Sequence, residues 1–307
     1  MCLFWFNFAC NPLQQIEDSI LNFMNSRNYT PEELERLHQE LYGILTEIVR
    51  VCDKCHIPYF VMGGTAIGAH FWQGIIPWDD DIDIGFTRDN YNRFLQVAPH
   101  ELRKPYTLQW VETDPHTPFY FAKVRKDNTL FVEQDFRWLP MHHGIFVDLF
   151  PFDRVPDNRV LQRVQRVVCN FFNCCFMGKD VWMWKYMRKS DIETPHRRGF
   201  LPCFANWLVD VCCSKHTIYR VLSKLQGMFN GCTTTHYNIV LMPHDYIPAE
   251  SIEHLQTVAF GPLSVSAPDN LESYLHHHYK NLRKYVPKEE QQNHRPIQLS
   301  FDAANAQ

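Results

Sequence analysis

The sequence predicts a fold of the α/β or α+β class with a helical region appended. Strand-like and helix-like runs alternate up to Asp153, as expected for a sheet with packed helices. From about Val160 to about Asn230 the chain changes to long helical stretches rich in Cys, Trp, Arg and Lys. A hydrophobic content of 45% and a charged content of 21% are those of a globular protein, and 307 residues can form one large domain or a core domain with a smaller one.

The first strong element is an amphipathic helix that begins at TPEELERL. Thr30 suits the N-cap, Pro31 suits the first helical position, and Glu33 completes a capping box. Apolar residues then recur at helical spacing, at Leu34, Leu37, Leu41, Ile44, Leu45, Ile48 and Cys52.

Shorter elements follow in alternation. The expected strands are 58–62, 81–86, 106–112, 119–126, 129–136 and 144–153, the last closed by Pro151. The expected helices are 63–72, after a tight turn, and 87–98, with Thr87 as its cap. Residues 126–128 (KDN) predict a hairpin turn, and 259–287 return to strand, turn and helix.

These runs predict four parts of the chain. They are an N-terminal segment (1–29), a catalytic core (30–157), a helical subdomain on the acceptor or membrane-surface side (158–235), and a C-terminal segment that closes the site and ends in a disordered tail (236–307).

Charge and cysteine usage narrow the class of protein. A formal net charge of −4 offers no overall attraction to nucleic acid, and no nucleic-acid partner is expected. Eleven cysteines, some adjacent, do not form a spaced disulfide framework, so they predict reduced thiols in a cytoplasmic protein. The apolar N-terminus, CLFWFNFAC, is shorter than the roughly 20 residues of a membrane span, and it docks either on a membrane surface or on the protein itself.

A dense group of carboxylates lies in the stretch IPWDDDIDIG, residues 76–85. Side chains alternate along a strand, so Asp81 and Asp83 share one face while Ile82 and Ile84 anchor the other. Hard oxygen ligands suit Mg²⁺ or Mn²⁺, which would make the adjacent charges tolerable. The alternative is an exposed acidic turn, and the alternation does not account for the two preceding aspartates, Asp79 and Asp80.

Two further features fit a metal–phosphate site. Gly63, Gly64 and Thr65 follow a strand and open a helix, whose N-terminus can receive a phosphate, although such glycines often form a tight turn only. Asp148 is a lone charge in an apolar strand, which predicts a metal or a cation beside it; the alternative is a structural salt bridge.

Lys123 and Arg125 supply the positive charge that a metal–phosphate site also needs. They project from the same face of the strand 119–126. A diphosphate lying across both would explain two adjacent cations, and a solvated strand face would explain them equally.

Together these residues resemble the signature of the LicD family, which includes the fukutin-type transferases. The likeness is carried by VMGGTAIGAHFWQGIIPWDDDIDIGFTRDNYNRFL, then FAKVRKDNT and HHGIFVDLFPFDRVP, and more loosely by FGPLSVSAPDNLESYLHHHYK. It spans about residues 56–155 strongly and 258–285 weakly. Near the end of this stretch a Tyr-Gly pair is expected and Tyr279–Lys280 is found, a departure that bears on donor specificity.

The resemblance implies an α+β nucleotidyltransferase fold like that of DNA polymerase beta, with a mixed-sheet core. It implies transfer of a phospho-alcohol, such as phosphocholine, from a CDP-alcohol donor to a cell-surface glycan or its lipid-linked precursor, with release of CMP. Mg²⁺ or Mn²⁺ would bind Asp81, Asp83 and Asp148, which would also carry the catalysis. The phosphate loop would be Gly63, Gly64 and Thr65, and the basic strand would be Lys123 and Arg125.

Rival interpretations stay open at this point. A true nucleotidyltransferase would release pyrophosphate, and an inactive nucleotide-binding scaffold would release nothing. The run 159–189 mixes Arg and Lys with aromatic residues, which fits either a helix on a membrane surface or an internally packed subdomain. The expected location is therefore cytoplasmic, or peripheral at the inner face of the membrane.

Overall fold

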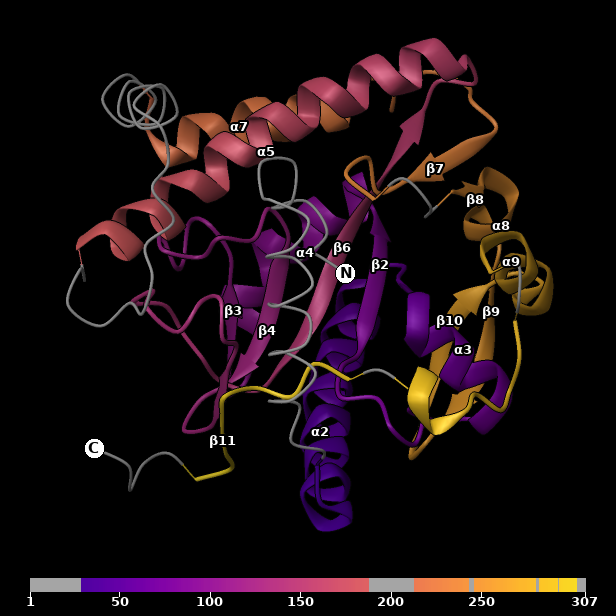
Figure 1. Cartoon of the computed structure of the whole chain (residues 1–307). Coiled ribbons are helices and arrows are strands. Elements are labelled where there is room, and N and C mark those ends of the chain that lie inside the picture. The colour runs from indigo at the N-terminus through magenta and orange to yellow at the C-terminus, as the bar shows by residue number, and fades with distance from the viewer. Residues whose placement is uncertain (1–28, 188–212, 243–245, 280–281, 292, 303–307) are drawn as a thin grey trace.

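A 25-residue helix, α2 (Pro31–Cys55), forms the base of the fold (Figure 1). The computed structural model describes residues 29–187, 213–242, 246–279, 282–291 and 293–302, and side chains within these ranges except at 180–187 and 289. Helix α2 begins as its sequence predicts, because Thr30 and Glu33 form a reciprocal capping box. Its apolar side, including Leu41, Ile44 and Ile48, is buried.

The central sheet is mixed. Its main strand order is β1 (Phe60–Val61), β2 (Asp83–Thr87), β6 (Phe146–Val155), β4 (Ala122–Lys126) and β3 (Tyr106–Gln109). The β2–β6 pair is parallel and the other pairs in this path are antiparallel. The sheet and its helices establish the α+β class, and the predicted strands 58–62, 106–112 and 119–126 are present in shortened form.

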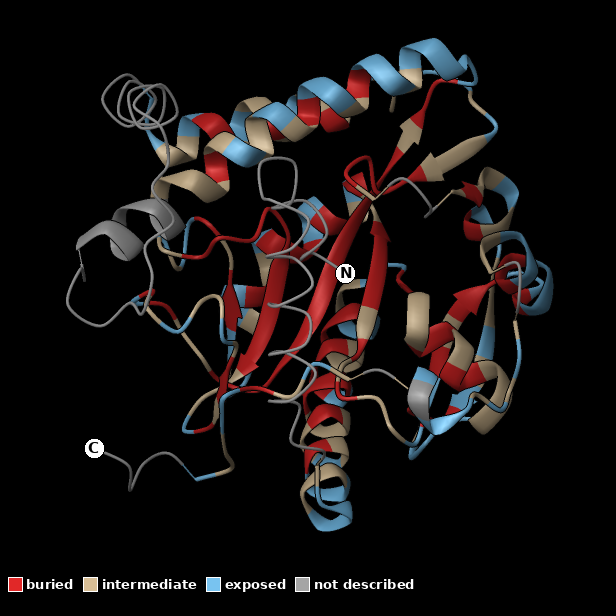
Figure 2. Cartoon of the chain, viewed as in Figure 1, coloured by how far each residue is buried: buried red, intermediate tan, exposed pale blue. Residues whose placement is uncertain are grey.

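Helices α2 and α4 (Arg88–Glu101) pack against one face of this sheet. The Phe86 ring of β2 lies 5.4 Å from the Phe94 ring of α4, between centroids, and both residues are fully buried. The buried residues concentrate in the sheet and on the side of α2 that faces it (Figure 2). Helix α3 (Gly63–Trp72) is as predicted and packs beside β1 and β2.

Strand β6 does not end at Pro151, which corrects the prediction from sequence. The strand continues to Val155. Its antiparallel neighbour β4 ends opposite Leu149, and the next neighbour on that side, β7 (His236–Asn238), begins opposite Asp153. Pro151 therefore lies in the gap between two neighbours, where its missing N–H breaks no ladder hydrogen bond.

The turn at 126–128 forms, and Asn128 has a φ of 58°, but the predicted hairpin does not. Strand β5 (Leu130–Val132) is shorter than the predicted 129–136, and it pairs with β11 (Gln298–Ser300), near the C-terminus, instead of β4. Its backbone partner is more than 160 positions away in sequence, so local pattern could not indicate it.

Helices α5 (Arg159–Met187) and α7 (Lys215–Gln226) pack together across the far end of the sheet (Figure 1). A buried ion pair of the core lies beneath α7: Arg88 Nε and Nη2 donate to the Asp153 carboxylate at 2.9 and 2.5 Å. The same guanidinium donates to Gln226 of α7 at 3.1 Å. This interaction fixes the helical layer to the ends of β2 and β6.

The predicted strand–turn–helix segment after 258 is also present. It consists of β9 (Leu255–Phe260), β10 (Leu263–Pro268) and α9 (Leu271–His278). Two short elements, β8 (Ile247–Pro248) and α8 (Ala249–Glu253), precede it, and a 3-10 turn, Lys288–Glu290, follows it. Residues 298–300 form β11, so the chain is structured as far as Asp302, while residues 303–307 lie outside the described ranges.

Seven described cysteines are free thiols. No helix in the described ranges is long and apolar enough to span a membrane. Residues 1–28, with the apolar N-terminus, lie outside the description.

Candidate active site

A row of polar side chains crosses four adjacent strands of the sheet. Asp83 on β2 is the register partner of Asp148 on β6, Asp148 is the partner of Lys123 on β4, and Lys123 is the partner of Gln109 on β3. Register partners lie on the same face of a sheet. Three of the residues predicted from sequence are therefore neighbours in space, although 65 positions separate Asp83 from Asp148.

This row faces away from α4. Side chains alternate along β2, and Ile84 and Phe86 are fully buried, with Phe86 against α4. Asp83 consequently points to the opposite face, where it is only partly buried. The predicted alternation of Ile82 and Ile84 with aspartates is confirmed by the burial, although β2 itself begins at Asp83 and not at Asp81.

Lys123 is enclosed, at 2% exposure. Its Nζ lies 2.7 Å from Asp148 Oδ1 and 3.4 Å from the centre of the Phe146 ring. A buried ammonium needs such partners, and an aromatic face provides a favourable one. The interpretation of this strand face as solvated is therefore wrong, and the ion pair expected at Asp148 is present.

Arg125 lies on the same face and is fully buried. Its Nε donates to Gln109 Oε1 at 2.5 Å, and Nη1 donates to the carbonyl of Gly144 at 2.6 Å. Burial lowers the pKa of its guanidinium to about 10. The side chain of Arg125 is thus enclosed by protein atoms, and its contact with the donor stays a prediction.

Burial and mutual repulsion raise the pKa of Asp81, Asp83 and Asp148. For Asp83 the pKa lies well above its usual range, because the group is buried and Asp81 and Asp148 are near. Burial also raises the pKa of Asp81, with Asp80 adding to the effect. Burial raises the pKa of Asp148 to about 6, although Lys123 opposes the shift. A bound cation would reduce the repulsion among these carboxylates.

The glycine turn lies directly against these carboxylates. Gly63 has a φ of 56°, and a Cβ there would lie 3.3 Å from Asp83 Oδ2. A Cβ on Gly64 would lie 2.9 Å from Asp79 Oδ2. The N-terminus of α3, which has no side-chain cap, thus opens beside the acidic group.

Thr65 is buried and has a structural contact. The backbone N–H of Asp83 donates to Thr65 Oγ1 at 2.8 Å. This hydrogen bond fixes the start of β2 against the first turn of α3, so the predicted phosphate loop and the predicted carboxylate strand form one unit.

Asp80 is a feature that the sequence did not explain. Its carboxylate is 2% exposed and accepts the backbone N–H of His294 at 2.9 and 2.8 Å on its two oxygens. Tyr29 Oη donates to it at 2.7 Å. Asp80 therefore holds the C-terminal segment 293–302 against the acidic loop, residues 79–81. His294 lies in a polar stretch, QQNHRPIQ, that carries no motif.

The donor set fits a divalent cation. Among the described residues, one group of three His, Cys, Asp or Glu side chains has ligand atoms that all lie within 4.8 Å of one another. It consists of Asp80, Asp81 and His294. Of the predicted ligands, Asp81 belongs to this group, whereas Asp83 and Asp148 do not and are neighbours of each other in the row. Buried carboxylate oxygens with raised pKa values are the ligands that Mg²⁺ and Mn²⁺ prefer.

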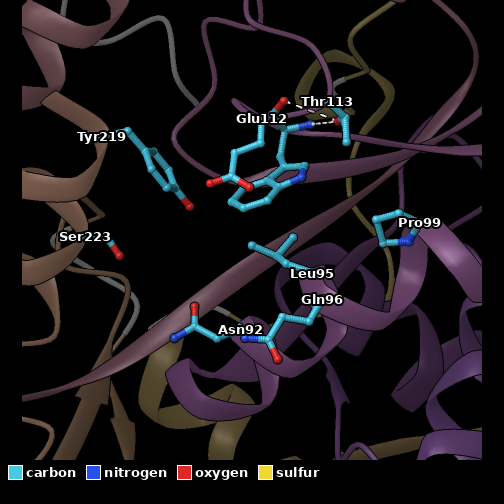
Figure 3. Close-up of a pocket in the computed structure, with 9 residues that line it drawn as sticks. Asn92, Leu95, Gln96, Pro99, Glu112, Thr113, Tyr219 and Ser223 are labelled. Carbon is cyan, nitrogen blue, oxygen red and sulfur yellow. Dashed lines mark hydrogen bonds between the residues drawn. The ribbon is translucent and has the colours of Figure 1, made fainter. Parts of the chain in front are cut away.

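A separate cavity of about 470 Å³ lies between α4, the segment after β3, and α7 (Figure 3). None of the predicted site residues lines it. Its walls are formed by Asn92, Leu95, Gln96, Pro99, Trp110, Glu112, Thr113, Tyr219 and Ser223.

The chain is similar to a protein-family model and to proteins of other organisms. Residues 56–197 match the family described as LicD/FKTN/FKRP, nucleotidyltransferase domain. The lipopolysaccharide cholinephosphotransferase LicD of Haemophilus influenzae is 25% identical over 264 residues, which span 82% of this chain and 92% of that protein. An uncharacterized protein of Rickettsia typhi is 33% identical over 75 residues, covering 24% of each chain. Another, of Rickettsia prowazekii, is 34% identical over 70 residues, covering 23% of this chain and 26% of its own.

Proposed function

We propose that this chain is a member of the LicD family and a phosphocholine-type transferase with a nucleotidyltransferase fold. It moves a phospho-alcohol from a CDP-activated donor to a hydroxyl of a cell-surface glycan or its lipid-linked precursor, and it releases CMP. The observation that supports this most is the likeness to a cholinephosphotransferase over 92% of that protein's length. The row of Asp83, Asp148 and Lys123 supplies charged groups that the proposed transfer needs.

The carboxylates are the proposed metal ligands. Asp81, Asp83 and Asp148 would hold Mg²⁺ or Mn²⁺, and the bound cation would neutralise the donor diphosphate and the charge that develops on the departing CMP. Thr65 accepts the backbone N–H of Asp83 and so fixes the start of β2, and Lys123 holds the carboxylate of Asp148 before any ligand arrives.

The donor phosphates are proposed to lie at the N-terminus of α3. The backbone N–H groups of Gly63, Gly64 and Thr65 begin the helix there, and the helix dipole favours a negative charge. Side chains in place of the glycines would collide with Asp79 or approach Asp83 closely. Arg125 acts as a positioning residue, because it holds Gln109 beside Lys123.

Asp148 is the proposed general base. An acceptor hydroxyl attacks the phosphorus that carries the alcohol; a new P–O bond forms, the P–O bond to CMP breaks, and CMP leaves with the electron pair. The hydroxyl proton passes to Asp148. Without a bound cation, burial raises the pKa of this carboxylate to about 6, which makes it more basic than an ordinary aspartate.

The test is product analysis. The purified chain is incubated with Mg²⁺ and a panel of CDP-alcohols, with and without candidate glycans, and both CMP and pyrophosphate are measured. Glycan-dependent CMP release is the expected result. Pyrophosphate release from nucleoside triphosphates would instead identify a nucleotidyltransferase and contradict the proposal.

A further inference from the structure

Helix α5 carries a stripe of large apolar side chains that face solvent. Val167 is 68% exposed and Phe171 is 62% exposed. The stripe also contains Val160, Leu161, Val164 and Val168, which are 36–66% exposed. Exposed surface follows the outer side of the first half of α5 (Figure 2).

The stripe is a second apolar face of the helix and not part of the core. At about 100° per residue, Val160, Val164, Val167 and Phe171 fall on one side of α5. The core-facing side is occupied by Cys169 and Phe176, which are fully buried, and by Gln165, which donates to backbone carbonyls at the end of α7. Internal packing therefore accounts for one face of α5 and leaves the other unexplained. The exposed face extends about 17 Å along the helix.

The charge around this stripe is mainly positive. Arg159 and Arg163 are exposed on the flank of the apolar face. Residues 158–179 and 213–232, which span most of α5 and all of α7, contain no Asp or Glu, although Asp157 precedes α5 and Asp180 lies within it. They carry seven basic residues, in a chain whose net charge is −4: Arg159, Arg163, Arg166, Lys179, Lys215, Arg220 and Lys224.

We infer that the outer face of α5 docks on an anionic lipid surface. Apolar side chains at the acyl boundary and arginines at the headgroups are the two contributions by which a helix binds in the plane of a bilayer. The excess of positive charge favours an anionic membrane over a second copy of this chain, since two such faces would repel. This inference stands apart from the proposed transfer reaction, because α5 begins beyond the end of β6 opposite to Asp148.

The test is co-sedimentation of the full chain with vesicles. Vesicles of phosphatidylcholine alone are compared with vesicles of equal parts phosphatidylcholine and phosphatidylglycerol. The chain is expected to pellet with the anionic vesicles, and less so at high salt. The double variant Val167→Glu/Phe171→Glu should lose at least about tenfold in partition. The matched control is Tyr285→Glu, at a residue 78% exposed and away from α5, which should bind as wild type does.

Three results would overturn the inference. One is failure of the wild-type chain to bind anionic vesicles. Another is equal binding by the double variant, whose folding is checked by circular dichroism. The third is a wild-type dimer, by light scattering, that the double variant converts to a monomer, because the stripe would then be a self-association surface. The transfer assay with a soluble acceptor reports on the proposed function separately, so either idea can fail without the other.

Discussion

Lys123 and Asp148 are register partners on adjacent antiparallel strands, and Lys123 Nζ lies 2.7 Å from Asp148 Oδ1 in the interior of the sheet face. The pair has side-chain exposures of 3% and 12%, so solvent screens it little. It balances one of the charges in a group of carboxylates that otherwise repel one another.

Replacing Lys123 by Met should lower the free energy of unfolding by about 3–5 kcal/mol, because the change leaves a buried carboxylate without its partner. Urea unfolding at pH 7 measures the effect. The double variant Lys123→Met/Asp148→Asn should recover most of the loss. Strictly additive effects of the two single changes would show that the ion pair is not coupled.

Asp81→Asn should reduce CMP release to about one hundredth of the wild-type rate or less, because the proposed cation loses a ligand. The folded state should be retained, since the change removes repulsion with Asp80. Activity and thermal unfolding are measured on the same preparation. The matched control is Asp302→Asn, at a carboxylate 79% exposed, which should keep both. Near-normal turnover in Asp81→Asn would exclude the proposed metal role.

Asp83→Asn should be more stable than wild type at pH 7 in the presence of a chelator, because the change removes a carboxylate whose charged form is disfavoured in the folded state. The pKa of Asp83 is raised in the folded state, chiefly by burial, so the folded chain binds more protons than the unfolded chain above about pH 4. Wild-type stability contributed by this group is therefore lost as the pH rises.

Near pH 4 and below, the wild-type Asp83 is protonated in the folded state, and the advantage of the variant should disappear. Added Mg²⁺ should also shrink it at pH 7, since the cation offsets the repulsion in wild type only. Denaturant unfolding across this pH range makes the comparison. A stability difference between Asp83→Asn and wild type that is the same at pH 4 and pH 7 would contradict the raised pKa of Asp83.

Asp80→Ala should release the segment 293–302 from the acidic loop. It removes the acceptor for the N–H of His294 and for the hydroxyl of Tyr29, and a buried group left without a partner costs about 1–3 kcal/mol. Hydrogen exchange of the His294 amide should accelerate. Asp302→Ala, which breaks an exposed pair with Arg36, should leave that amide protected.

The sequence predicted well the features that depend on neighbouring residues. The capping box of Thr30 and Glu33, the helix after Gly63, and the burial of Ile82 and Ile84 between aspartates all follow from local chemistry. The expectation that Asp148 has a cation beside it is confirmed for the same reason: a lone charge among apolar strand residues needs a partner.

The features that depend on pairing between distant segments could not be predicted. Strand β6 passes Pro151 because β4 and β7 leave a gap there, which is a property of the neighbours. Arg125 is enclosed because Gln109 and the Gly144 carbonyl accept from it, and no period-two pattern reveals that. The partner of Asp80 lies 214 positions away, in a segment of ordinary polar composition.

The contact between Asp80 and His294 can form only after residue 294 has been synthesised. At about 5–20 residues per second, about 10–40 s separate the synthesis of the acidic loop from that of its partner 214 positions later. During that interval the carboxylate of Asp80 has only Tyr29 to satisfy it, and the nascent protein holds an unfinished cluster of negative charge. The acidic loop therefore reaches its final contacts late in synthesis. A chain that stops before residue 294 would keep the strands of the central sheet but lack the contact that holds the loop.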